Sequence, residues 1–342
     1  MNESQLQNVS LTGEMSQELA LELFENGGVL IFKDFPKGCE FGMDYRSWIV
    51  GPNFLGMKMI PPGIHFIYFS VPEVILRRWD KKKEDLVTDE KSDEVELDRL
   101  RENLRNIDRF LGVYPFADYR NWLSLSSYIT PNSVRRLSPS NSLGRISSQN
   151  EMVTQEAELE KKLGDPFGLS IVDREHRGRI RFTDEGGLPL MSEGEEAKLN
   201  FTRIPQITLA DTNLRRAGID SSDRLFQCFD ALGGDYRQVL AEFQFAFVVF
   251  LVGQVYEGFD QWKRLVHLFC SCTSALQSHP QFFNELFAMY WPAAIFLSST
   301  LALLFANIED TPAVDPALKT KATRFRTLLE KRFKRAFVLD ND

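Results

Sequence analysis

Cysteine is scarce in this sequence. Four cysteines occur in 342 residues, at positions 39, 228, 270 and 272, and their spacing is uneven. A small secreted domain that depends on disulfides carries more cysteines at closer intervals, so this pattern favours a reducing compartment. The N-terminus is polar and lacks the apolar segment of a signal peptide. We therefore expect free thiols and no secretion signal.

An excess of positive charge is also missing. The chain has 40 Lys and Arg against 48 Asp and Glu, a net charge of −8. Proteins dedicated to nucleic acids need surplus Lys and Arg for phosphate contacts, so this class is disfavoured. Residues 319–335 run against the trend, with eight basic residues and Glu330 as the only acid, a local net charge of +7. This segment is either a solvated helix face or a surface that binds an acidic protein surface or RNA electrostatically.

Catalytic motifs are absent too. No G-x-x-x-x-G-K-[ST], H-E-x-x-H or G-x-S-x-G pattern occurs. His65 has no carboxylate or nucleophile nearby in sequence, which favours a hydrogen-bonded structural role. His267, Cys270 and Cys272 lie close together, but zinc needs about four ligands and no second cysteine pair follows. We therefore expect that the protein is not an enzyme and that it binds no cofactor. A hydrolase or metal enzyme using His65 or the His267, Cys270 and Cys272 cluster is the alternative.

One apolar stretch is long enough to cross a bilayer. Residues 286–306 contain 21 residues without a charge. Pro292 interrupts the stretch, a Ser-Ser-Thr sequence at 298–300 makes its centre weakly polar, and no cluster of Lys or Arg flanks it. A buried helix, or two short ones, is favoured, and a membrane span is the alternative.

Length and composition predict an α+β multidomain protein. A chain of 342 residues with 43% hydrophobic residues can form a core in each of two domains. We expect a β-rich domain with flanking helices at 1–92, a helical extension at 93–137, a flexible linker at 138–204 and an all-α domain at 205–342. The linker is rich in Ser, Gly and charge and has few regular apolar positions.

The first half shows a mixture of strand and helix signals. Ser16 is placed to cap a helix at 17–26, and strands are predicted at 29–32, 41–45, 64–69 and 74–79. The run 64–69 is apolar throughout and bounded by turn residues, which is typical of a buried strand. Further helices are expected at 116–129 and, after a Thr130 cap and Pro131, up to residue 137. A further helix is predicted before them, ending at Gly112. Its apolar face is made by residues at steps of three and four: Leu97, Leu100, Leu104, Ile107 and Leu111.

The second half has helical periodicity. Asp220 and Asp235 are candidate N-caps, and Gly233-Gly234 separates two helices. Gly258 and Asp260 are expected to mark a further boundary. The last helix is predicted at 316–337. Its apolar stripe consists of residues spaced four positions apart: Phe325, Leu329 and Phe333.

One string is more specific than any of these patterns. Residues 51–66, GPNFLGMKMIPPGIHF, resemble the N-terminal signature of the Aar-two splicing factors. The resemblance extends to residues 30–32, 36–38, 40–45, 74–80, 110–115 and 122–125, and in the second half to 241–247 and 262–265. It departs from the family in two places. Strand material that the family carries between 64–69 and 74–79 is missing here, and a second gap lies near 290–295.

The resemblance implies a non-enzymatic assembly chaperone of the U5 small nuclear ribonucleoprotein (U5 snRNP). Such a protein binds the RNase H-like and Jab/MPN-like domains of the large spliceosomal scaffold protein and holds off a helicase. We therefore expect U5 snRNP components as partners, a location in cytoplasm and nucleus, no membrane, and no direct sequence-specific contact with nucleic acid.

Three segments are candidates for partner binding or control. The proline-rich turn beside Lys58 either closes the fold or presents this lysine to a partner. The end of the chain either frays or adds as a strand to a partner's sheet; its candidate residues are Lys331, Arg332, Lys334, Arg335, Phe337, Val338 and Leu339. Ser138 follows Arg135-Arg136-Leu137 at the start of the linker and is a candidate for regulatory phosphorylation, with an unmodified linker serine as the alternative.

Overall fold

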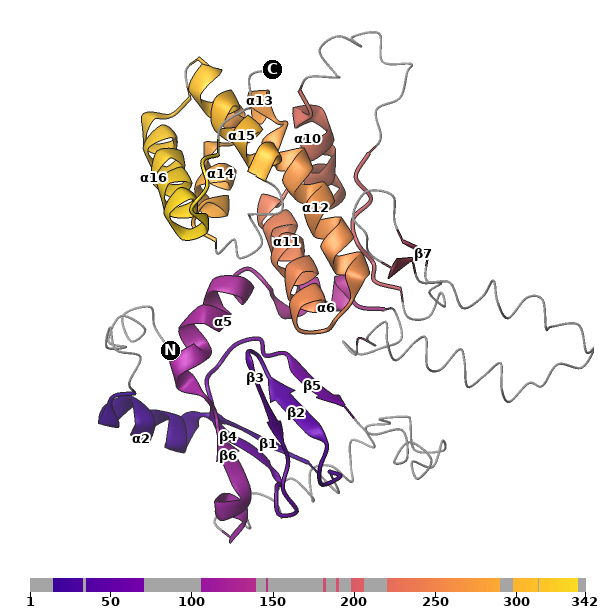
Figure 1. The fold of residues 1–342 in the computed structure, drawn as a ribbon, viewed down its shortest axis with the longest axis vertical. Coiled ribbons are helices and arrows are strands. Elements are labelled where there is room, and N and C mark those ends of the chain that lie inside the picture. Colours follow the sequence, from indigo (N-terminus) through magenta and orange to yellow (C-terminus); the bar gives the residue numbers. More distant parts are fainter. Residues whose placement is uncertain are drawn as a thin grey trace, which may run out of the picture. The chain divides into compact units, whose positions relative to one another are not determined.

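The computed structural model describes residues 15–32, 35–70, 106–139, 146, 181–182, 189–190, 198–205, 220–289, 298–312 and 314–337. The chain divides into two compact units, Met1–Leu123 and Ser124–Asp342. The first contains two small sheets, and the second consists mainly of helices (Figure 1). The expected α+β class is confirmed. The division at Leu123 lies inside the predicted helical extension 93–137.

The first unit is built around two three-stranded sheets. One has the order β1-β4-β6, from Gly28–Ile31, Gly56–Ile60 and Leu111–Val113, and β4 and β6 are parallel. The other has the order β3-β2-β5, from Arg46–Ile49, Glu40–Met43 and Ile67–Ser70, and both its pairings are antiparallel. The helices of this unit are α2 (Gln17–Asn26), the 3-10 turns η2 (Asp108–Phe110) and η3 (Phe116–Asp118), and α5 (Tyr119–Ser126), which continues into the second unit.

Phe41 is the centre of an aromatic core in this unit. Its side chain is fully buried, and in the sheet it stands between Trp48 on β3 and Phe69 on β5. The rings of Phe32 and Phe54 lie 5.2 Å from it, centroid to centroid. Aromatic side chains bury the largest apolar areas, which explains how so small a sheet forms a core.

Several predictions for the first unit hold and others are wrong. α2 covers the predicted residues and Ser16 caps it, accepting from the backbone N–H of Leu19. The run 64–69 is not a buried strand, because β5 begins only at Ile67 and Phe69 is 49% exposed. Leu111 and Gly112 are not helical, because they pair with Gly56 and Met57 of β4. The helix expected at 116–129 is the turn η3 followed by the shorter α5. Strand 74–79 and Leu97, Leu100 and Leu104 lie outside the described residues.

The second unit packs its helices around α11. The described helices are α6 (Pro131–Leu137), α10 (Ser222–Ala231), α11 (Tyr236–Leu251), α12 (Tyr256–Cys270), α13 (Thr273–Ser278), α14 (Pro280–Leu286), α15 (Ser298–Asp310) and α16 (Pro316–Phe333). A two-residue pair, β7 (Arg181–Phe182) and β8 (Pro189–Leu190), completes the described elements. Residues 239–249 of α11 are buried without interruption, so neighbours cover it on all sides.

Gly258 allows α12 to approach α11 closely. A Cβ atom at this position would lie 2.5 Å from the carbonyl oxygen of Ala246, closer than real Cβ atoms come. The predicted boundary at Gly258 and Asp260 is therefore wrong, since both residues lie inside α12 and the glycine serves helix packing. The predicted separation of α10 and α11 by Gly233 and Gly234 is confirmed, and both glycines have positive φ.

Two predicted caps are present in the second unit. Asp235 accepts a hydrogen bond from the backbone N–H of Arg237 and caps α11. Asp220 accepts from the backbone N–H of Ser222, one residue before the assigned cap of α10. α16 ends earlier than predicted, at Phe333, because Lys334 adopts the left-handed conformation that commonly ends helices. Among the described residues, no helix is long and apolar enough to cross a membrane.

Candidate functional sites

Asp44 is the hub of a buried polar cluster in the first unit. It occupies the turn between β2 and β3 with φ 55°, and it is 2% exposed. One carboxylate oxygen, Oδ2, lies 2.7 Å from Nδ1 of His65 and accepts the hydroxyl of Tyr114 at 2.6 Å. The other, Oδ1, accepts the backbone N–H of Phe66 at 2.9 Å. These three hydrogen-bonding groups replace the water that a carboxylate loses on burial.

The ring of His65 lies between two acceptors. Nδ1 faces the Asp44 carboxylate, and Nε2 lies 2.8 Å from the carbonyl oxygen of Pro61. Both nitrogens must donate to satisfy these contacts, and only the doubly protonated ring has two N–H groups. Burial by itself lowers the pKa of His65, but the hydrogen bond and charge of Asp44 and the Pro61 carbonyl outweigh it and raise the pKa above its ordinary value. The contacts therefore favour a protonated His65 that pairs with the buried carboxylate of Asp44.

This cluster holds the proline-rich turn at 61–66 in place. Tyr119 donates its hydroxyl to the Pro62 carbonyl at 2.9 Å, and Trp122 donates its indole N–H to the Ile64 carbonyl at 2.6 Å. The ring of Tyr119 also stacks on His65. Side chains of α5 thus bind a segment that precedes them by more than fifty residues. The part of the signature string that follows β4 is a fold-closing turn.

The cluster lacks the geometry of a catalytic site. Tyr114 donates to Asp44, and burial and the charge of Asp44 raise the pKa of its phenol, so it stays protonated. No serine, threonine or cysteine side chain is hydrogen-bonded to His65 among its described contacts. A nucleophile must lie within reach of its base. The structural role predicted for His65 fits these contacts. The sequence reasoning missed the pairing of His65 with Asp44, because the two residues lie 21 positions apart.

Lys58 points into the fold. Its Nζ lies 2.6 Å from Oδ2 of Asp108 and above the ring of Phe24, and its side chain is 15% exposed. This residue also lies within strand β4 and not in a free loop. The contacts favour the fold-closing role over the presentation of Lys58 to a partner.

The His267, Cys270 and Cys272 cluster offers poor metal ligands. Burial raises the pKa of both thiols, so the thiolate that a metal needs is disfavoured. Cys272 Sγ donates to the Leu268 carbonyl, and His267 Nδ1 lies 3.1 Å from the hydroxyl of Thr300. In the described ranges no three His, Cys, Asp or Glu side chains gather as a metal site. The expectation of buried helix residues holds for Cys270, whereas His267 is exposed and Cys272 is buried between α12 and α13.

A buried carboxylate in the second unit was not predicted. Glu242 on α11 is 1% exposed and pairs with Arg136 of α6 at 2.8 Å. It also accepts the backbone N–H of Thr202 at 2.8 Å and the hydroxyl of Thr202 at 2.6 Å. Gln261 of α12 donates to Glu242 and to the Thr202 carbonyl, each at 3.0 Å. The end of the predicted flexible linker, residues 198–205, is thus bound to the helices.

Ser138 and Phe337 are both buried. Ser138 is 1% exposed, with its hydroxyl unpaired, and Asn200 donates to its carbonyl at 2.8 Å. A kinase could reach this hydroxyl only if the segment opened. Phe337 is 1% exposed and its ring lies 6.4 Å from that of Phe305. A partner could bind it only if the chain end detached. Val338 and Leu339 lie outside the described residues.

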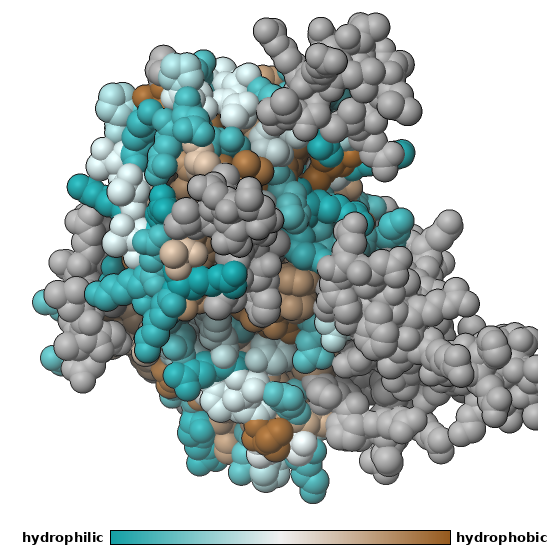
Figure 2. All heavy atoms as spheres, turned by 45° about the horizontal axis from the view of Figure 1, so that its top comes forward, coloured by the Kyte–Doolittle hydropathy of each residue, from teal (hydrophilic) through white to brown (hydrophobic). Residues whose placement is uncertain are grey.

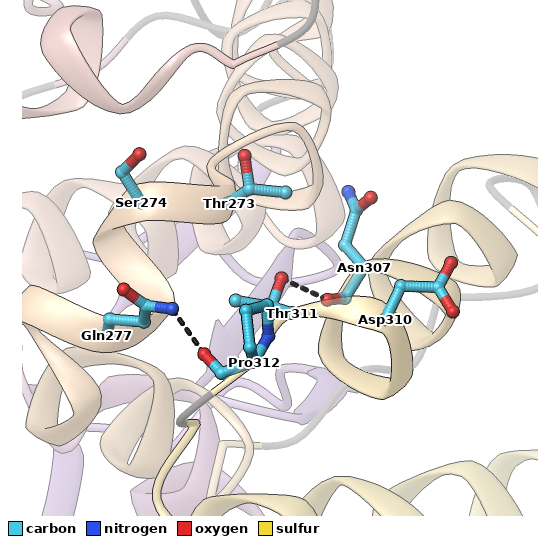
Figure 3. A pocket seen from close by; sticks show the side chains of 7 residues that line it. All are labelled: Thr273, Ser274, Gln277, Asn307, Asp310, Thr311 and Pro312. Carbon is cyan, nitrogen blue, oxygen red and sulfur yellow. Dashed lines mark hydrogen bonds between the residues drawn. The ribbon is translucent and has the colours of Figure 1, made fainter.

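The polar depression of the second unit shows no ligand chemistry. It has a volume of about 320 Å³ and is lined by Thr273, Ser274, Gln277, Asn307, Asp310, Thr311 and Pro312 (Figure 3). Gln277 donates to the Pro312 carbonyl, and Thr311 donates its hydroxyl to the Asn307 carbonyl. These four residues therefore bind one another in pairs. On the face shown in Figure 2, hydrophobic residues in brown appear as scattered patches among hydrophilic residues in teal.

Comparison with known proteins identifies related chains over nearly the full length. A Caenorhabditis elegans protein named "Protein AAR2 homolog" is 38% identical, over 96% of this chain and 99% of its own. The human and mouse proteins of the same name are 30% and 31% identical, over 96% and 94% of this chain and 94% and 93% of their own. The alignment to the nematode protein spans 364 positions, more than the 342 residues here, so that relative has residues without a counterpart in this chain.

The family models match both units. The model described as "AAR2 N-terminal domain" matches residues 26–73 and 69–139, and the one described as "AAR2 C-terminal repeat region" matches residues 201–337. The first match is split just after β5, where the sequence predicted missing strand material. The second is continuous across 290–295. The chain therefore belongs to the AAR2 family, the splicing-factor family that its signature string resembles.

Proposed function

We propose that this protein is a non-enzymatic assembly chaperone of the U5 snRNP in pre-mRNA splicing, acting in cytoplasm and nucleus. Membership of the AAR2 family supports a splicing-related role of this kind. The observation that carries the proposal is the family match in both units, with relatives aligned over 94–96% of this chain.

The mechanism that we propose is competition between partners. The chaperone binds the RNase H-like and Jab/MPN-like domains of the large spliceosomal scaffold protein. A helicase that needs an overlapping surface is then held off, because any ligand that occupies the surface weakens its rival by mass action. No bond is made or broken, so the protein needs binding surfaces and no reactive group.

The contacts of the reactive side chains support this proposal. His65 donates to Asp44 and Pro61, and Tyr114 donates to Asp44. The thiols of Cys270 and Cys272 are buried, with raised pKa values. An enzymatic alternative would use His65 or the two thiols, and His65 binds within the fold while the thiols are buried.

A binding experiment with the purified full chain tests the proposal. The scaffold fragment that contains both domains is immobilised, and binding of the helicase is measured with rising amounts of this protein. We expect direct binding to the fragment and a fall in bound helicase with the same midpoint. Simultaneous, unperturbed binding of both proteins would contradict competition, and no binding to the fragment would contradict the choice of partner.

A further inference from the structure

The basic residues of α16 belong to two groups with different contacts. Arg326 pairs with Glu309 at 3.0 Å and with Glu330 at 3.1 Å. Lys321 donates to the Asn284 carbonyl at 2.5 Å, and Lys319 lies 3.5 Å from the Glu309 carbonyl. This first group links α16 to α14 and α15, and its charges serve the fold.

The second group lies on the outer side of the helix. Arg324 and Lys331 are exposed, and Leu328 between them is 60% exposed. Steps of four and three residues place the three side chains on one face, opposite the buried residues of the helix; those are Leu318, Ala322, Phe325 and Leu329. Lys334 and Arg335, just past the helix end, are exposed as well. We call Arg324, Leu328 and Lys331 the α16 stripe.

The stripe is not explained by the stability of the helix. Basic residues in a last turn are favoured by the helix dipole, which accounts for Lys331. Arg324 lies more than two turns from the end, and an exposed leucine between two cations adds nothing to the dipole. The segment 319–335 has a net charge of +7 in a chain of −8, so the rest of the chain carries −15. A positive surface with an apolar centre is thus set in an acidic protein.

We propose that the α16 stripe binds an acidic protein segment that places an apolar side chain against Leu328. The charges complement Asp and Glu of the partner, and Leu328 provides the apolar contact around which such interfaces form. The phosphate backbone of RNA binds cations but makes no apolar contact with an aliphatic side chain. The exposed Leu328 therefore favours a protein partner over RNA. This inference does not depend on which spliceosomal protein the chain binds.

Fluorescence anisotropy with a defined probe tests the stripe. The probe is a labelled 16-residue peptide of Glu with Leu at every fourth position, titrated with the full chain in low salt. In Arg324→Glu/Lys331→Glu we expect binding to weaken at least about tenfold, because two attractions become repulsions. The matched control is Arg203→Glu/Arg264→Glu, which changes exposed basic residues of the same unit and alters net charge equally. We expect the control to bind within about twofold of the unchanged chain.

Two further measurements identify the class of partner. Leu328→Ala should weaken peptide binding several-fold and leave binding of a single-stranded oligouridine unchanged. Arg324→Gln/Lys331→Gln should give an intermediate loss, and thermal unfolding of each variant checks that it is folded. No binding of the peptide to the unchanged chain, equal losses in the stripe and control variants, or a Leu328→Ala variant with normal peptide affinity would each overturn the proposal. So would oligouridine binding tighter than the peptide with the same dependence on Arg324 and Lys331.

Discussion

The carboxylate of Asp44 lies 2.7 Å from Nδ1 of His65, although the two residues are 21 positions apart. The contact joins the turn between β2 and β3 to the residues that lead into β5. Because the other ring nitrogen faces the Pro61 carbonyl, a protonated imidazole donates to both acceptors and forms a salt bridge with Asp44. The pair and its partners come from three separate stretches of the sequence, at Asp44, residues 61–66 and Tyr114, so it forms only when the first unit folds.

The ion pair makes stability dependent on pH. The folded pKa of His65 is raised, so its contribution is fully present below the unfolded value of about 6.5 and is lost as pH rises through the folded pKa. We expect the thermal midpoint of the unchanged chain to fall as pH rises above about 6.5 and that of His65→Gln to change less. His279→Gln, which changes another histidine, is the control. If the thermal midpoints of His65→Gln and the unchanged chain changed in parallel with pH, a group other than His65 would be the cause of the pH dependence.

Removal of the anion should cost more than removal of an exposed charge. In Asp44→Asn the cation of His65 stays buried without its counterion, and we expect a loss of about 3–5 kcal/mol in the free energy of unfolding. Denaturant titration followed by tryptophan fluorescence measures this, since Trp122 lies in the same unit. Asp235→Asn, at an exposed cap of α11, is the control for a general effect of the substitution. An equal, small loss in both variants would contradict the buried ion pair.

Large aromatic residues should dominate the stability of the second unit. Trp262 is 1% exposed and Phe247 is 5% exposed, and their ring centroids are 5.3 Å apart. Replacement of either by Ala should cost about 3–5 kcal/mol of unfolding free energy. Leu328→Ala, at an exposed position of α16, should change it by less than about 0.5 kcal/mol. Denaturant titration compares the three variants, and equal midpoints would contradict the packing described.

Asp220 should matter more than an ordinary helix cap. Its carboxylate accepts backbone N–H groups of Ser222 at the start of α10 and of Thr273 and Ser274 in α13. Burial acts to raise its pKa, but hydrogen bonds from the hydroxyls of Ser222 and Ser274, and from their backbone N–H groups, outweigh it and lower the pKa below its usual value. Its contribution is thus present above the unfolded pKa and lost as pH falls through the folded one.

We expect Asp220→Ala to cost about twice as much as Asp235→Ala, which removes a single cap worth about 0.5–2 kcal/mol. Denaturant titration at neutral pH compares the two variants. The difference between them should shrink at low pH, where Asp220 is protonated in the unchanged chain. A cost for Asp220→Ala no larger than for the control would show that the contacts at α13 add nothing.

Two truncations near the end of the chain distinguish a residue that packs in the core, Phe337, from two candidate binding residues, Val338 and Leu339. A chain that ends after Phe337 keeps the ring buried near Phe305 and removes Val338 and Leu339. If these two residues add to a partner's sheet, this chain should dissociate faster from the scaffold fragment with unchanged thermal stability. A chain that ends after Arg335 should also unfold at a lower temperature, because Phe337 leaves the core. Surface-binding kinetics and thermal unfolding distinguish the two effects. Unchanged dissociation after loss of Val338 and Leu339 would show that the tail does not bind.

The charge-mimicking variant Ser138→Glu tests the regulatory hypothesis. Since Ser138 is 1% exposed and its carbonyl accepts from Asn200, a carboxylate there should loosen residues 198–205 from the helices. We expect lower thermal stability and faster proteolysis near residue 205, whereas Asn132→Glu, at an exposed position of α6, should leave both unchanged. A stable Ser138→Glu variant that alters only partner dissociation would instead support phosphorylation as a direct switch.

Local signals determined much of the secondary structure. The cap at Ser16, the Thr130 cap with Pro131, the Asp235 cap and the Gly233-Gly234 break all appear where the sequence predicts them. Each involves contacts within about four residues, so the residue types alone are informative. The signature string was also sufficient to indicate the family, because it is a property of the linear sequence.

Only the tertiary structure decided the roles of residues that meet across long distances. Leu111 follows a helical period, yet it pairs with Gly56 in a sheet, because a strand partner outweighs a weak local preference. Asp44 and Glu242 lie in stretches that carry the family resemblance, but the linear sequence shows no partner for either, and each is the centre of a buried network whose partners lie 19 to 106 residues away. Buried charges persist only where donors surround them, and sequence spacing does not reveal which donors converge.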